Sequence, residues 1–111
     1  MLANLSKIKE KDIEAYLRDS IKAKGGRAYK FVSPGNTGVP DRIVLLPGGK
    51  IVFVELKAPG KKPTAIQLAQ QKMIADLGFE VLVIDSKVEV DALMHILPNH
   101  GKKESWGQYG I

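Results

Sequence analysis

The sequence predicts a single α/β domain with a central mixed sheet flanked by helices, in the order α-β-β-β-α-β-α. Three observations predict this class. Apolar residues recur at helical spacing in some segments and as short strand-like runs in others, with turn residues between them. A helical segment separates the last two strands, which favours a right-handed parallel crossover. The chain has 111 residues, the length of one domain, and shows no repeat or internal boundary.

The chain is predicted to begin with an amphipathic helix, followed by a strand and a loop. Residues 10–24 carry apolar side chains at helical spacing, and a Gly-Gly pair follows them as a stop signal. Residues 28–33 (AYKFVS) are typical of a strand. Residues 33–40 (SPGNTGVP) are rich in Gly and Pro, which predicts a loop.

A β-hairpin is predicted next. Residues 41–46 (DRIVLL) and 50–57 (KIVFVELK) have strand composition, and Pro47-Gly48-Gly49 between them is a turn signal. The basic segment 58–63 (APGKKP) is then expected to be a second loop.

The remainder is predicted as helix, strand and helix, followed by a tail. The helices cover residues 64–78 and 86–97, and the strand covers residues 79–85. The expected helix boundaries are Thr64, Gly78 and Ser86. Residues 1–97 are therefore expected to form the folded domain, and the polar, glycine-rich residues 98–111 a C-terminal tail.

Composition narrows the classes of function. The formal net charge is +5, which favours a polyanion such as nucleic acid but equally fits a solvated basic surface. The absence of Cys excludes disulfides and cysteine zinc sites, and two His are too few for a histidine metal centre. No apolar run approaches the roughly 20 residues of a membrane helix. We expect no membrane association and a cytoplasmic location.

The strand at residues 50–57 ends in two charged side chains, Glu55 and Lys57. Side chains alternate along a strand, so these two share one face with Ile51 and Phe53. Both faces are otherwise apolar, which predicts a strand covered on both sides. Burying an unpaired charge is costly. Glu55 and Lys57 therefore need partners, water or a bound ion.

The hairpin register decides whether a second carboxylate lies near Glu55. With a three-residue turn, Leu46 pairs with Lys50 and Asp41 faces Glu55. Two carboxylates at that spacing repel each other unless a cation lies between them. A two-residue turn would instead place Asp41 opposite Leu56, on the other face.

A third carboxylate is expected from the first helix. Relative to Ile13, Glu10 lies at about 60° and Glu14 at about 100° around the helix axis, so both fall on or beside the apolar stripe. For Glu10 the alternative is simple support of the helix dipole. Two or three carboxylates beside a Lys favour Mg²⁺ or Mn²⁺. A structural network of ion pairs explains the pattern equally well.

The spacing of these residues resembles the PD-(D/E)XK nuclease motif: Pro40-Asp41, thirteen intervening residues, then Glu55-Leu56-Lys57. The closer resemblance, over roughly residues 8–90, is to stand-alone phage and bacterial members of the VRR-NUC family. It is carried by the segments GVPDRIVLLPGG, FVELKAPGKKPTAIQ and GFEVLVID. The resemblance implies a restriction-endonuclease-like fold.

The resemblance also implies roles for individual residues. Asp41, Glu55 and the backbone carbonyl of Leu56 would bind the metal ion, and Lys57 would be the catalytic lysine. Gln67 matches a family Gln that would hold a metal-bound water or a phosphate, although it is also explained as a solvent-facing helix residue.

The similarity to the related archaeal Holliday-junction resolvases favours Glu10 over Glu14 as the acid of the first helix. Two loops would contact DNA, one through Ser33 and Asn36 and the other through Lys61 and Lys62. Loop solubility is an equally good explanation of each Lys alone.

The sequence thus predicts an endodeoxyribonuclease that depends on Mg²⁺ or Mn²⁺ and leaves a 5′-phosphate. By analogy with the junction resolvases, a homodimer would cut branched or Holliday-junction DNA. The alternative from another class is a non-catalytic DNA-binding module with a structural network of acids and Lys. RNA as the substrate also remains open.

Overall fold

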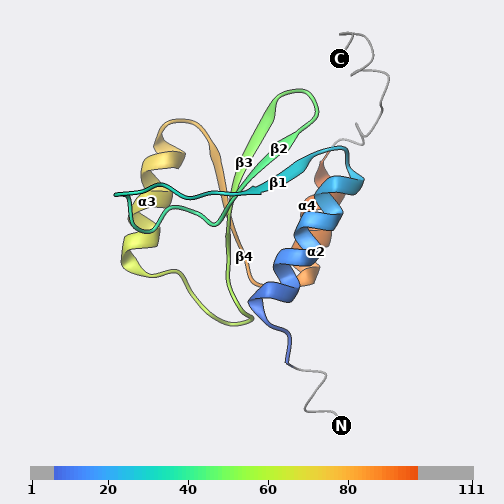
Figure 1. Cartoon of the computed structure of the whole chain (residues 1–111), viewed down its shortest axis with the longest axis horizontal. Helices are drawn as coiled ribbons and strands as arrows, with labels where there is room; N and C mark the ends of the chain where they lie inside the picture. Colours follow the sequence, from blue (N-terminus) through green and yellow to red (C-terminus); the bar gives the residue numbers. More distant parts are fainter. Residues whose placement is uncertain (1–6, 98–111) are drawn as a thin grey trace.

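The computed structural model describes residues 7–97, which form a four-stranded mixed sheet with helices on both sides (Figure 1). The elements are α2 (Glu10–Ala23), β1 (Arg27–Lys30), β2 (Arg42–Leu46), β3 (Lys50–Leu56), α3 (Ala65–Asp76), β4 (Glu80–Ile84) and α4 (Lys87–Ile96). The strands lie in the order β1-β2-β3-β4. The predicted fold class and order of elements are confirmed. The predicted tail, residues 98–111, lies outside the described residues.

The hairpin between β2 and β3 has the register of a three-residue turn. Leu46 pairs with Lys50, and Ile43 pairs with Phe53. β3 and β4 are parallel, as the intervening helix predicts. β3 is therefore a central strand, and β1 and β4 form the two edges of the sheet.

The core lies between the sheet and the pair of helices α2 and α4, which pack side by side on one face (Figure 1). The buried apolar residues are Ile13, Leu17, Ile21, Val44, Val52, Val54, Leu56, Ile84, Val90, Leu93 and Leu97. Burial of one such Leu, Ile or Val side chain contributes about 1.5–3 kcal/mol. This face supplies most of the apolar burial of the described residues.

The opposite face of the sheet is only partly covered. α3 lies on this side (Figure 1) and contains no buried residue. Its side chains Ile66, Leu68 and Met73 are exposed, and Phe53 beneath is half-buried between Phe31 and Phe79. The expectation that both faces of β3 are covered is therefore met fully only on the side of α2 and α4.

β1 differs most from its predicted span of residues 28–33, because it ends at Lys30. Phe31 still donates its N–H to the carbonyl of Asp41, at 2.8 Å. The next partner along β2 would be Pro40, which has no N–H to donate, so the ladder cannot continue.

The predicted helix boundaries are confirmed. The hydroxyls of Thr64 and Ser86 accept hydrogen bonds from the backbone N–H groups of Gln67 and Glu89, at 3.2 and 3.1 Å. Gly78 follows α3 with a φ of 100°, which favours glycine. Among the described residues, no helix has the length and apolarity to cross a membrane.

Candidate active site

The carboxyl end of β3 brings together the residues that the sequence singled out. The hairpin register pairs Arg42 with Val54, and its continuation places Asp41 opposite Glu55. The Asp41 carboxylate also accepts a hydrogen bond at Oδ2 from the backbone N–H of Leu56, at 2.7 Å. This bond fixes Asp41 against the end of β3. The proximity of the two acids, which depended on the register, follows from the three-residue turn.

Glu55 is the buried charged side chain of the described domain, with 1% of its surface exposed. Its Oε2 lies 3.4 Å from the ammonium of Lys57 and accepts a hydrogen bond from the side-chain amide of Gln67, at 2.9 Å. Its Oε1 is buried and has no hydrogen-bond partner within residues 7–97. Burial and the neighbouring Asp41 raise the pKa of Glu55 to about 7, although Lys57 opposes the shift. An unsatisfied buried oxygen of this kind costs free energy.

The two acids of α2 have different surroundings. Burial raises the pKa of Glu10 above its ordinary value, and the charge of Asp41 raises it further, while Lys57 lowers it. Glu10 therefore shares the electrostatic environment of the acids at the end of β3. Glu14 instead forms an ion pair with the guanidinium of Arg42, whose Nε lies 3.1 Å from its carboxylate.

Gln67 is oriented by the cap of α3. Its side-chain oxygen accepts the N–H of Thr64 at 2.9 Å, so the amide nitrogen is the end that donates to Glu55. The reciprocal bond from its own N–H to Thr64 completes the cap. The capping box at the start of α3 thus orients Gln67 so that its amide donates a hydrogen bond to the buried carboxylate of Glu55.

The four residues predicted to contact DNA lie in the two loops. The side-chain amide of Asn36 donates to the hydroxyl of Ser33 at 2.9 Å, which stabilises the loop after β1. Lys61 and Lys62 are exposed in the loop after β3. The structure shows no contact of either Lys with the buried carboxylate of Glu55.

Arg42 is a residue that the sequence analysis did not single out. Besides its ion pair with Glu14, it donates to the carbonyl of Ala28 at 3.4 Å, so it ties α2 to both β1 and β2. The sequence contained an indirect signal for the direction of the Arg42 side chain. Arg42 follows Asp41, so alternation points its side chain toward the opposite face, where the helix lies.

The donors at this end of β3 fit a hard divalent cation. Within residues 7–97, no group of three or more His, Asp or Glu side chains is gathered so that it could hold a metal ion. The side-chain oxygens that could bind such an ion are therefore the two carboxylates of Asp41 and Glu55. The unpartnered Oε1 and the raised pKa of Glu55 both show a carboxylate that a cation would stabilise. Oxygen-only donors suit Mg²⁺ or Mn²⁺.

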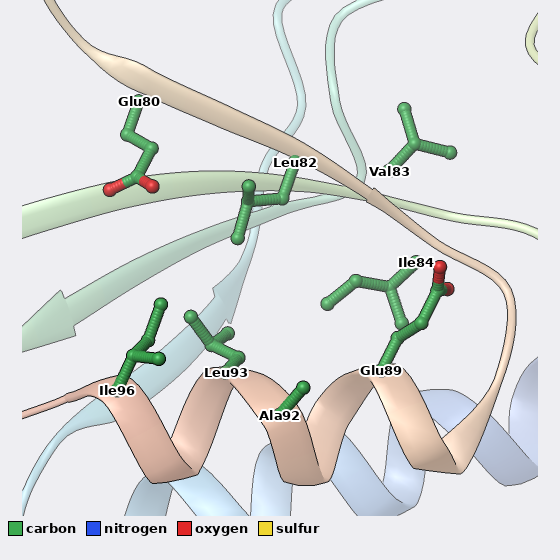
Figure 2. Close-up of a pocket in the computed structure, with 8 residues that line it drawn as sticks. All are labelled: Glu80, Leu82, Val83, Ile84, Glu89, Ala92, Leu93 and Ile96. Atoms are coloured by element: carbon green, nitrogen blue, oxygen red, sulfur yellow. The ribbon is translucent and has the colours of Figure 1, made fainter.

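A hollow of about 290 Å³ between β4 and α4 is a separate feature (Figure 2). Its lining is mostly apolar, with Glu80 at one end and Glu89 at the other. None of the predicted site residues lines it. Asp41 and Glu55 thus lie at a strand end and not in this hollow.

Comparison with known proteins gives two close similarities, although no family model matches the chain. The chain is 55% identical over 80 residues to "Putative nuclease p44" of Acyrthosiphon pisum secondary endosymbiont phage 1. This match covers 72% of the chain and 86% of that protein. A solved structure described as "VRR_NUC domain" is 33% identical, with a TM-score of 0.75. It covers 80% of this chain and 97% of its own.

Proposed function

This chain belongs to the VRR-NUC family, and we propose from that premise that it is an endonuclease that hydrolyses phosphodiester bonds of DNA. The observation that carries the proposal is the buried carboxylate of Glu55, which has one unpartnered oxygen. Asp41, Lys57 and Gln67 surround it at the end of β3. A purely structural ion-pair network would gain no stability from leaving this oxygen unpaired.

The proposed cofactor is Mg²⁺ or Mn²⁺, held by Asp41, Glu55 and the carbonyl of Leu56, with Glu10 at the edge of the site. Such an ion supplies a Lewis acid that polarises a phosphoryl oxygen and lowers the pKa of water. The hydrogen bond from Gln67 keeps the carboxylate of Glu55 in one orientation, which pre-organises this ligand.

Lys57 is the proposed catalytic lysine. Its side chain is 15% exposed, so the ammonium reaches the site while most of its stem is covered. In this position it orients the attacking water or offsets the charge that develops on the phosphate oxygens. A positive charge in a partly desolvated site stabilises such charge far more than one in bulk water does.

The proposed substrate is branched DNA, such as a Holliday junction, and the proposed assembly is a homodimer in the cytoplasm of a bacterium or an infected host. Two active sites related by symmetry would cut two strands. The apolar side chains exposed on and after α3 support an assembly, because a partner would cover them: Ile66, Leu68, Met73, Leu77 and Phe79.

A cleavage panel tests the function. End-labelled duplex, flap, splayed and four-way DNA are incubated with Mg²⁺, Mn²⁺ or EDTA, alongside a matched RNA duplex and the Glu55→Gln variant. We expect internal cuts with a 5′-phosphate, only with metal and only by the unmodified protein. DNA binding without cleavage under every condition would establish the non-catalytic module instead.

A further inference from the structure

A row of cations follows one side of α2 and the edge strand β1. We call it the basic track, and its members are Lys11, Arg18, Lys22, Arg27 and Lys30. All five side chains are exposed. On α2, the three cations fall within about 40° of one another around the helix axis. The cations of α2 therefore form one continuous row, and Arg27 and Lys30 extend it along the edge strand with side chains on opposite faces of the sheet.

The contacts of α2 show which way this surface faces. Arg18 and Lys22 line a hollow of about 390 Å³ together with Arg27 and Tyr29 of β1. The other flank of α2 contacts α4, where Tyr16 bonds to Asp91. The basic track thus lies along the open edge of the sheet, beside β1.

The acids near the basic track neutralise it only in part. Glu14 is engaged by the guanidinium of Arg42, and Asp19 is 3.5 Å from Arg18 alone. The opposite edge of the sheet has the reverse charge. There, β4, α4 and the turn between them carry four acids and one Lys: Glu80, Asp85, Glu89, Asp91 and Lys87. A polyanion is therefore attracted to the β1 edge and repelled from the β4 edge.

We infer that the basic track binds the phosphate backbone of a DNA duplex arm that leads away from the acids at the end of β3. This inference rests on the proposed function and adds the surface that holds the substrate. Lys11 follows Glu10 directly, so the track begins at the site. The twelve residues from Lys11 to Lys22 span about 16 Å of helix. At 3.4 Å per phosphate along a strand, this length matches about five phosphates.

The side chains of the basic track favour backbone contact over base reading. Lys and Arg neutralise phosphates without regard to sequence. Tyr29 is the one large apolar side chain that lines the hollow, and it is half-exposed. The track therefore supplies affinity and orientation of a duplex arm, and the acids at the end of β3 supply the chemistry.

The test is a charge-matched pair of triple variants. Arg18→Ala/Lys22→Ala/Arg27→Ala removes three charges from the basic track. Lys50→Ala/Lys72→Ala/Lys87→Ala removes three exposed charges elsewhere. Binding of a labelled 20-base-pair duplex is followed by fluorescence anisotropy in EDTA, from 50 to 200 mM salt. Cleavage by the same proteins is measured with Mn²⁺ at saturating DNA, and thermal melting checks the fold.

We expect the basic-track variant to bind at least tenfold more weakly. Its slope of log affinity against log salt should fall by about 2–3, because three phosphate contacts are lost. Its rate at saturating DNA should be unchanged, and the control triple should bind within about twofold of the unmodified protein. If the triple variant is unstable, the single variant Lys22→Gln replaces it, because Lys22 is exposed. This single variant should lower the slope by about 1.

Two outcomes would overturn the inference, and they differ from failure of the proposed function. If the basic-track variant kept its affinity and salt slope while the unmodified protein cleaved DNA, only the inferred surface would be wrong. Equal losses in both triple variants would likewise show an effect of net charge. If the unmodified protein neither bound nor cleaved DNA, the proposed function and the inferred surface would both be wrong.

Discussion

At its carboxyl end, β3 buries side chains of both faces to the same depth but uses them in opposite ways. On one face, Val52, Val54 and Leu56 are 0–1% exposed and pack against α2 and α4. On the other face, Glu55 is also 1% exposed but carries a charge and an unpartnered oxygen. The first face stabilises the fold through apolar burial, whereas the second gives up stability to hold a reactive group.

This difference shows that burial alone does not tell what a side chain contributes. The apolar face is covered by two helices, so each side chain there is satisfied by packing. At Glu55 the neighbours are Asp41, Lys57 and Gln67, and together they still leave Oε1 without a partner. The contrast leads to variants that change cleavage without changing stability, and to others that do the reverse.

The largest expected effect is the loss of cleavage in Glu55→Gln. Its amide retains the size of the carboxylate but removes the charge that the metal ion requires. Without metal, the variant should be as stable as the unmodified protein or more so, because a buried charge near Asp41 is gone. Asp41→Asn should behave similarly in cleavage. Gel assays and thermal melts in EDTA measure the two quantities.

The contrary result for Glu55→Gln is specific. Wild-type cleavage would show that the metal site is elsewhere. Lower thermal stability in EDTA for both variants would instead favour a structural ion-pair network at the end of β3.

Lys57→Ala should lower the cleavage rate by about 10²–10³-fold, as expected for losing a donor that stabilises developing charge. Binding of Mn²⁺ should stay unchanged or become tighter, because a nearby positive charge is removed. Lys57→Arg should recover little, since a guanidinium is larger than an ammonium at this packed position. Calorimetry with Mn²⁺ separates the roles: a variant that cleaves slowly because it cannot bind metal would make Lys57 structural.

The opposite face of β3 should show the reverse pattern. Leu93 of α4 belongs to the core on that side and is 4% exposed. Leu93→Ala should lower the free energy of unfolding by about 2–5 kcal/mol. Cleavage per folded molecule should remain normal at temperatures well below the melting transition. A large loss of activity in fully folded Leu93→Ala would show that the two faces are not independent.

The pKa of Glu55 predicts a pH dependence of stability in EDTA. Its pKa is about 7 in the folded protein against 4.5 for the free side chain, so the folded state holds the proton more tightly. The proton on Glu55 therefore adds about 3 kcal/mol to the free energy of unfolding below pH 4.5. This stabilisation is lost as the pH rises through 7. Denaturant melts of the unmodified protein and of Glu55→Gln measure it. The dependence should be weaker in Glu55→Gln, and Mn²⁺ should stabilise the unmodified protein more at pH 8 than at pH 5.

The sequence predicted the strand that carries the site, but it did not predict where β1 ends or which residues contact the acids. The alternation along β3 and the Pro-Gly-Gly turn were sufficient to place Asp41 opposite Glu55, once the three-residue turn was assumed. The end of β1 was missed because it depends on Pro40, which lies just before the neighbouring strand β2 and outside residues 28–33.

The partners of the acids were harder to predict than the acids themselves. The helical angles of Glu10 and Glu14 differ by only about 40°, so spacing alone left both on or beside the buried stripe. The contact that distinguishes them comes from Arg42, a residue 28 positions away from Glu14. A link of this range follows from the tertiary fold and has no local signal.

The smallest expected effect separates these two acids. Glu10→Gln should lower cleavage by about 10–100-fold, the size seen when a supporting group at a metal site is removed. Its stability in EDTA should hold or rise, because Glu10 is repelled by Asp41.

Glu14→Gln should instead lose about 1 kcal/mol of stability, since Arg42 keeps its bond to Ala28 but loses its ion partner. Its cleavage should change little if α2 remains in place. Arg42→Gln breaks the same pair from the other side and also removes the bond to Ala28, so it should lose at least as much stability while its cleavage again changes little. Glu14→Gln and Arg42→Gln with near-normal stability but lost cleavage would mean that this ion pair, and not Glu10, connects α2 to the chemistry.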